Sequence, residues 1–117
     1  MKIIYKNKKT EKLCEDTKKA IKVLGKDIAI SLANLINAIE EFNCLYDISL
    51  FPQYRLHQLS NNRQYQYSLT IQRSSKWRLI IYPLDEDENI WKSYENEKIK
   101  LTKAVCIEVL EVSKHYE

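Results

Sequence analysis

The spacing of apolar residues changes near the middle of the chain. Between residues 11 and 42 these residues recur every three or four positions, which is the period of an amphipathic helix. Between residues 54 and 83 they alternate with polar residues in the segments YRLHQL, YQYSLTIQR and WRLIIYP, which is the period of a half-buried strand. Helices followed by strands predict the α+β class.

The first half of the chain predicts a short strand and then a helical hairpin. The strand is KIIYK. Thr10 is placed to cap a first helix, and Gly25, the only glycine, is a natural stop for it. Asp27 can open a second helix, and the short link implies a hairpin. The expected apolar faces are Leu13, Thr17, Ile21 and Leu24 on the first helix and Ile28, Leu32, Leu35, Ile39 and Phe42 on the second.

The three strand-like segments are separated by the turn sequences SNNR and SSK, so we expect an antiparallel meander. Successive side chains of a strand point to opposite faces, which sorts the residues into two sets. The apolar set, expected to face the helices, is Leu56, Leu69, Ile71, Leu79 and Ile81. The polar, basic and aromatic set, expected on the second face, is Arg55, His57, Ser68, Thr70, Gln72, Arg78 and Tyr82.

A highly charged connection, LDEDENIWKSYENEKIKLTK, follows the meander, and we expect a helical turn in it around Trp91 and Tyr94. The segment AVCIEVLEV is apolar on both sides, so it is predicted to be a strand in the middle of the sheet. The predicted order is β-α-α-β-β-β-(short helix)-β with a mostly antiparallel sheet. A length of 117 residues predicts a single domain, residues 1–117.

Composition excludes several classes of function. No stretch approaches the roughly 18 to 20 apolar residues of a membrane span, and no secretory signal is visible, so the cytoplasm is the expected location. Cys14, Cys44 and Cys106 form no CxxC pair, which argues against a disulfide framework or a zinc site. One glycine cannot build a phosphate-binding loop. We therefore expect neither a metal nor a cofactor.

The basic residues are distributed unevenly. No acidic residue occurs between Ile48 and Leu84, while every arginine of the protein falls there. The cations of this block are Arg55, Arg63, Arg73, Lys76 and Arg78. The planar guanidinium suits phosphate better than the lysine ammonium does, and the interleaved aromatic residues could stack on bases. RNA binding is one interpretation, and a half-buried sheet with a solvated face is the other.

His57 and His115 are the only histidines, and each lies beside cations and a tyrosine. Histidine can act as base or acid at neutral pH. RNA cleavage needs a base for the 2′-OH, an acid for the 5′-oxygen and cations for the phosphate. Either histidine could instead be structural.

The strand region carries four short motifs in a characteristic order. They are LHQL at 56–59, NNR at 61–63, YSL at 67–69 and WRL at 77–79, followed by a strand that runs into VSKHY. This arrangement resembles the HigB toxins of the RelE/ParE superfamily, the bacterial plasmid-maintenance killer proteins. In that family the motifs are Leu-His-x-Leu, Gly-Asp-Arg, Tyr-Ser-Ile and Trp-Arg-Ile, and the last strand closes in Asp-Tyr-His.

The resemblance implies a RelE-like fold and a ribosome-dependent mRNA endonuclease. It places the family's Leu-His-x-Leu histidine on His57, its Trp-Arg arginine on Arg78 and its turn arginine on Arg63. The ending departs from the family pattern, because the closing triplet falls on Lys114, His115 and Tyr116. Since strands alternate, a bulge or bend after Val112 is needed if all three serve one site.

The leading hypothesis from the sequence is metal-independent RNA cleavage. His57 and His115 would share base and acid work, Arg78 and Lys114 would hold the phosphate, and Tyr116 would stack on a base or relay a proton. RNA or ribosome contacts are expected from Arg55, Arg63, Arg73 and Lys76.

The expected partners are mRNA, the ribosome and a helix-turn-helix antitoxin of the HigA type, with which a toxin would form a heteromeric complex. The alternatives are a non-nuclease toxin of the ParE type that inhibits DNA gyrase and a non-catalytic RNA-binding α+β module.

Overall fold

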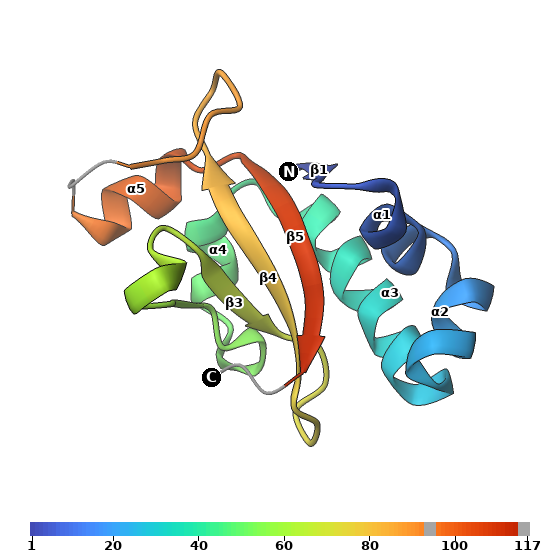
Figure 1. Ribbon diagram of the computed structural model, residues 1–117. Coiled ribbons are helices and arrows are strands. Elements are labelled where there is room, and N and C mark those ends of the chain that lie inside the picture. The colour runs from blue at the N-terminus through green and yellow to red at the C-terminus, as the bar shows by residue number, and fades with distance from the viewer. Residues whose placement is uncertain (93–95, 115–117) are drawn as a thin grey trace.

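The computed structural model describes residues 1–92 and 96–114, in which helices and strands form an α+β fold as predicted (Figure 1). The helices are α1 Lys8–Glu15, α2 Thr17–Leu24, α3 Lys26–Glu41, α4 Leu45–Ser49 and α5 Glu97–Lys103, with single 3-10 turns η1 Pro52–Tyr54 and η2 Asn61–Arg63. The strands are β1 Lys2–Tyr5, β2 His57–Gln58, β3 Tyr67–Thr70, β4 Trp77–Leu84 and β5 Cys106–Lys114.

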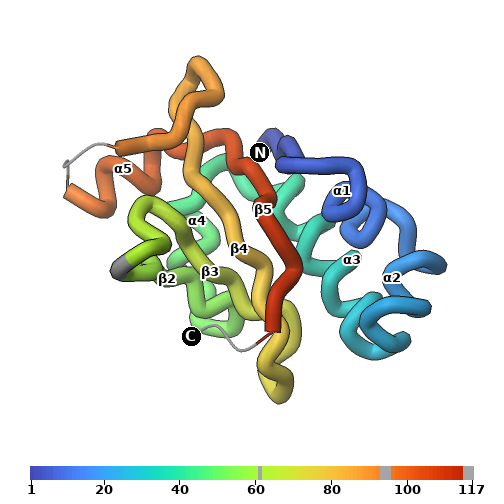
Figure 2. Tube along the Cα trace, in the orientation of Figure 1, coloured from blue at the N-terminus to red at the C-terminus, as the bar shows by residue number. Residues whose placement is uncertain are grey.

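The strands form one open sheet in the order β1-β5-β4-β3-β2. The pairs β2–β3, β3–β4 and β4–β5 are antiparallel, which confirms the predicted meander, while β1 pairs with β5 in parallel. β5 lies between β1 and β4, so the prediction that the last strand is central is confirmed. Figure 2 shows the short β2 beside β3, at the edge of the sheet.

The first predicted helix is two helices, because Asp16 interrupts it. Asp16 has extended backbone angles (φ −114°, ψ 97°), and its carboxylate accepts a hydrogen bond from the Lys19 amide as the N-cap of α2. The cap of α1 is Asn7, which accepts from the Thr10 amide, so the assignment of Thr10 as the cap is wrong. Short polar side chains accept hydrogen bonds from backbone N–H groups in this way. Such a cap can end a helix even where the helical spacing of apolar residues continues past it.

Gly25 ends α2 as predicted, and its φ of 85° is a left-handed value that favours glycine. The same residue is the N-cap of α3, so Asp27 lies in the first turn of that helix and does not open it. The predicted hairpin is therefore a run of three helices, continued by the unpredicted α4.

α3 and α4 cover one face of the sheet and form the hydrophobic core with it (Figure 1). Leu32, Ile39 and Ile48 are fully buried from the helix side. On the strands, Leu69, Leu79 and Ile81 are also fully buried, Ile71 is buried, and Leu56 packs against the cluster. The predicted core-facing register is confirmed.

The connection after β4 differs from its prediction. Trp91 lies outside any helix, and its amide donates to the carbonyl oxygen of Pro83 at 3.0 Å. The helix of this segment, α5, begins later, at Glu97, where Asn96 caps it. Tyr94 lies outside the described residues. No helix in the described part of the chain is long and apolar enough to cross a membrane.

Candidate nucleic-acid interface

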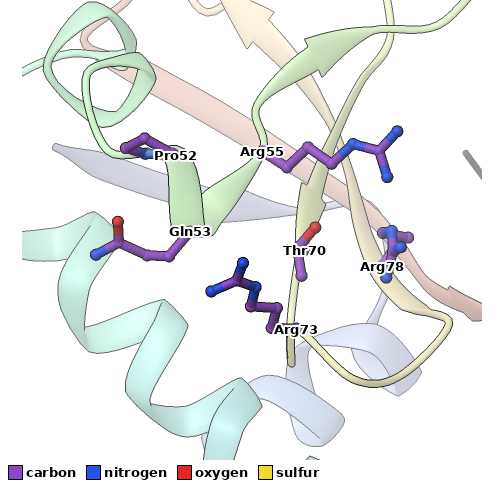
Figure 3. A pocket seen from close by; sticks show the side chains of 6 residues that line it. All are labelled: Pro52, Gln53, Arg55, Thr70, Arg73 and Arg78. Carbon is purple, nitrogen blue, oxygen red and sulfur yellow. The ribbon is translucent and has the colours of Figure 1, made fainter.

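A pocket of about 550 Å³ lies between η1 and the hairpin that joins β3 to β4 (Figure 3). Its lining residues are Pro52, Gln53, Arg55, Thr70, Arg73 and Arg78. Three of the four arginines of the protein are therefore in one pocket, and none of the lining residues is acidic. This charge pattern is suited to an anion.

Arg55 reaches the pocket because of an unusual backbone turn. Its φ of 45° and ψ of 48° are left-handed, and its amide donates to the carbonyl oxygen of Pro52 at 3.1 Å, which closes η1. The turn carries the chain away from the sheet, so β2 pairs with β3 only at His57 and Gln58. The edge of β3 at Thr70 consequently faces η1 and the pocket, as Figure 3 shows. A strained backbone of this kind is common at functional sites.

Thr70 and Arg78 form a cross-strand pair, so their side chains share the second face of the sheet. Arg78 Nη1 donates to the carbonyl oxygens of Ser75 and Trp77, each at 2.9 Å, and these bonds hold the guanidinium against the hairpin. Thr70 is 7% exposed. Its hydroxyl and Arg78 Nε are buried and have no hydrogen-bond partner among the described residues. Buried polar groups without a hydrogen-bond partner cost free energy.

The hairpin between β3 and β4 presents Arg73 and Lys76 to solvent. Ser75 shapes the turn, since its amide and hydroxyl both donate to the carbonyl oxygen of Gln72 at 3.0 Å. Arg73 lines the pocket, whereas Lys76 does not. Gln72, expected on the second face, donates instead to the Ser31 hydroxyl of α3 at 3.4 Å, because β3 ends at Thr70 and strand alternation stops there.

His57 lies next to the pocket on the same face. It pairs with Ser68 on β3, one alternation step from Thr70. His57 Nδ1 is 2.9 Å from the carbonyl oxygen of Arg55. A carbonyl only accepts, so Nδ1 carries the proton, and the basic nitrogen of the neutral ring is Nε2. One backbone turn thus places Arg55 and fixes the tautomer of His57.

The other two described candidates lie apart from this pocket. Arg63 Nη1 is 3.3 Å from Glu111 Oε2 of β5 and 3.0 Å from Gln66 Oε1, so it is part of an ion pair across the sheet. Lys114 pairs with Trp77, and its ammonium lies 5.7 Å from the centre of the indole ring. Because alternate residues face opposite ways, Lys114 is on the other face from Arg78.

β5 has a bulge, but it lies before Val112. Ile80 pairs with Glu111 and Ile81 with Val109, so the extra residue is Leu110, before Val112. The pairing from Val112 to Lys114 is regular. His115 and Tyr116, the other two residues of the predicted catalytic ending, lie outside the described residues.

Three lining residues were not among the predicted site residues. The predicted alternation placed Thr70 on the same face as Arg78, which the structure shows as its cross-strand partner, so the alternation could have identified Thr70. No sequence pattern identifies Pro52 and Gln53 as lining residues, because the 3-10 turn η1 positions them at the pocket. Across residues 1–92 and 96–114, no three side chains of His, Cys, Asp or Glu are grouped closely enough to hold a metal ion.

Neither a scan of protein-family models nor a search of curated proteins finds a match to this chain.

Proposed function

We propose that this protein is a toxin of the HigB type with a RelE-like fold, which cuts mRNA on the ribosome without a metal ion. The observation that supports this proposal is the position of His57 beside a pocket lined by three arginines. A base and a concentrated positive charge are two of the three elements that cleavage through the 2′-OH requires.

The arginine pocket would hold the RNA backbone. Guanidinium groups bind phosphate oxygens in pairs, which fixes the orientation of the phosphate as well as its position. Arg78 is held by two backbone carbonyls, so its guanidinium is fixed before RNA arrives. Arg55 and Arg73 are exposed and can close on the bound strand.

The proposed reaction begins at His57. Its Nε2 takes the proton of a ribose 2′-OH, and the 2′-oxygen attacks the adjacent phosphorus. The new P–O2′ bond forms as the P–O5′ bond breaks, and an acid gives the leaving 5′-oxygen its proton. The products are a 2′,3′-cyclic phosphate and a 5′-OH end. The arginines stabilise the charge that develops on the non-bridging oxygens.

The acid in this scheme would be His115 or Tyr116, on the basis of the family resemblance. We do not include Lys114 in the site, because its ammonium lies over Trp77 on the opposite face. Arg63 and Lys76 would contact RNA or ribosome outside the pocket. The proposed cellular inhibitor is a helix-turn-helix antitoxin whose contacting segment is acidic, in a heteromeric complex.

The test is the substitution His57→Gln, assayed on translating ribosomes. We expect the cleavage rate to fall by about a hundred- to ten-thousand-fold, the usual loss for a general base. RNA binding should be retained because the arginines remain. Gln58→Ala is the matched control, since Gln58 is the next residue of β2, is exposed and faces the other way. Undiminished cleavage by the His57 variant would exclude the proposed base.

The proposed acid, His115 or Tyr116, is tested separately. Removing the three residues after Lys114 leaves β5 complete. We expect this truncation to abolish cleavage while the protein stays folded by circular dichroism. His115→Ala and Tyr116→Phe then show which residue is the acid. DNA breaks with intact messages in cells that express the protein would contradict the nuclease proposal and indicate a gyrase inhibitor.

A further inference from the structure

The charge of the arginine pocket exceeds that of an internal RNA phosphate. Arg55, Arg73 and Arg78 bring three positive charges, and no lining residue is acidic. A single phosphodiester within a chain carries one negative charge against these three positive charges. A phosphomonoester at a chain end carries about 1.5 to 2 negative charges at neutral pH and three strong acceptor oxygens.

Hydrogen-bond donors are also concentrated at this pocket. The Thr70 hydroxyl, on a side chain only 7% exposed, is buried without a partner among the described residues, and so is Arg78 Nε. In Figure 3 Thr70 lies among the three arginine side chains. A diester offers two non-bridging oxygens to this set of donors, whereas a monoester offers three.

The pocket has room for more than the phosphate. Its volume of about 550 Å³ is within the range of small-molecule sites. Gln53 and Pro52 line it together with the arginines, and they supply an amide and an apolar ring. These groups suit the base and sugar of one nucleotide.

We propose that the arginine pocket binds the terminal phosphomonoester of a nucleotide in preference to the phosphodiesters inside an RNA chain. Within the proposed function, a mononucleotide with a terminal phosphomonoester would compete with the RNA backbone for this pocket and inhibit cleavage. This inference rests on the proposed function only in taking RNA as the polynucleotide that is bound. The preference for a monoester is argued from the charges of the pocket residues alone.

The experiment is isothermal titration calorimetry of the full chain with four probes: uridine 3′-monophosphate, uridine 5′-monophosphate, the methyl ester of uridine 3′-phosphate, and inorganic phosphate. We expect the better monophosphate to bind at least about tenfold more tightly than the methyl ester, which corresponds to about 1.4 kcal/mol. Inorganic phosphate should bind more weakly than that monophosphate if the nucleoside is recognised. Equal binding of monoester and methyl ester would overturn the proposal.

The pH dependence gives an independent readout. The second proton of a phosphomonoester leaves near pH 6, so its affinity should rise between about pH 5.5 and 7.5. Arginine side chains are positively charged throughout this range, and the two other basic groups near the pocket, His57 and Lys76, are the same for both probes. The methyl ester keeps one charge over this range, so it measures any contribution of His57. Parallel pH profiles for the two probes would contradict the proposal.

Two substitutions connect the selectivity to the pocket. Arg73→Gln removes one of the three charges from an exposed hairpin and should reduce the preference for the monoester about tenfold or more, a cost typical of a lost charge-assisted contact. Thr70→Val keeps the shape but removes the hydroxyl and should weaken monoester binding. Lys12→Gln on α1 is the control, since it removes an equal charge from an exposed residue outside the pocket. An unchanged preference in both pocket variants would refute the assignment.

Cleavage on translating ribosomes is measured with the same preparations, so that the two proposals can fail separately. Cleavage without monoester selectivity refutes this inference and leaves the proposed function standing. Selectivity without cleavage supports this inference and refutes the nuclease.

Discussion

Arg55 combines a strained backbone with a charge that faces the pocket. A side chain with a Cβ in the left-handed region costs roughly 1 to 2 kcal/mol, a cost that glycine does not have. We therefore expect Arg55→Gly to be more stable than Arg55→Ala by about 1 kcal/mol. Both variants lose the guanidinium and should bind RNA more weakly. Urea unfolding and RNA titration measure the two effects separately.

Gln53 provides the control for this comparison, because it belongs to the same turn and does not have a positive φ. There the order should reverse, with Gln53→Ala more stable than Gln53→Gly. If alanine is the more stable replacement at Arg55 as well, the left-handed conformation does not carry the expected strain.

At the level of the element, the bulge in β5 decides which side chains face the second side of the sheet. The extra residue, Leu110, brings Glu111 opposite Ile80, and Glu111 there accepts the ion pair from Arg63. The pair joins η2 to β5 across the face that carries His57. It also places a negative charge beside Arg63, one of the proposed RNA-contacting residues.

Glu111→Gln tests this role. The side chains of the pair are 27% and 42% exposed, and pairs of this kind contribute about 0 to 1 kcal/mol, so the free energy of unfolding should fall by less than 1 kcal/mol. RNA affinity should rise, because Arg63 is no longer neutralised, and the rise should shrink in high salt. The measurement is RNA titration at low and high salt. Weaker binding would mean that the pair positions Arg63 for RNA and does not compete with it.

At the scale of the whole molecule, several buried or partly buried acidic groups are held in their neutral form. Burial, with a smaller contribution from Glu15, raises the pKa of Cys14 to about 12. Burial and the hydrogen bond to Glu15 raise the pKa of Tyr5, and burial and Glu97 raise the pKa of Tyr67. In each case the folded state keeps a proton that the unfolded chain loses as the pH rises.

The sign of the resulting pH dependence follows from this difference in bound protons. Stability is complete below the ordinary cysteine pKa and is lost as the pH rises above it towards the folded pKa. For Cys14, which is 5% exposed, the loss is about 1.4 kcal/mol per pH unit above roughly pH 9. Urea unfolding between about pH 7 and 10.5 should show this decline. Cys14→Ala should make it shallower, and equal slopes in both proteins would contradict the prediction.

The structure of the strand half was predicted from the sequence more completely than that of the helical half. In the strands, the five residues predicted to face the core do so, because alternation is a local property of each segment. Tyr67 is a further core residue that was not predicted, and Ser68 and Thr70, expected on the second face, are buried as well. In the helices, the spacing of Leu13, Thr17 and Ile21 continues through Asp16, so it could not reveal the break. The break depends on the Asp16 cap, whose side-chain hydrogen bond to the backbone is an alternative to the hydrogen bonds of a continuous helix.

The sequence by itself determined the class of the fold, the order of the strands in the meander, the core-facing register and the confinement of arginine to one block. These properties depend on residue type and short-range spacing. Only the tertiary structure decided that Arg55, Arg73 and Arg78 line one pocket while Arg63 binds Glu111 and Lys114 lies over Trp77. The physical reason is that the left-handed turn at Arg55 brings this arginine to the pocket and the bulge at Leu110 brings Glu111 opposite Ile80, and neither leaves a periodic signal in the chain.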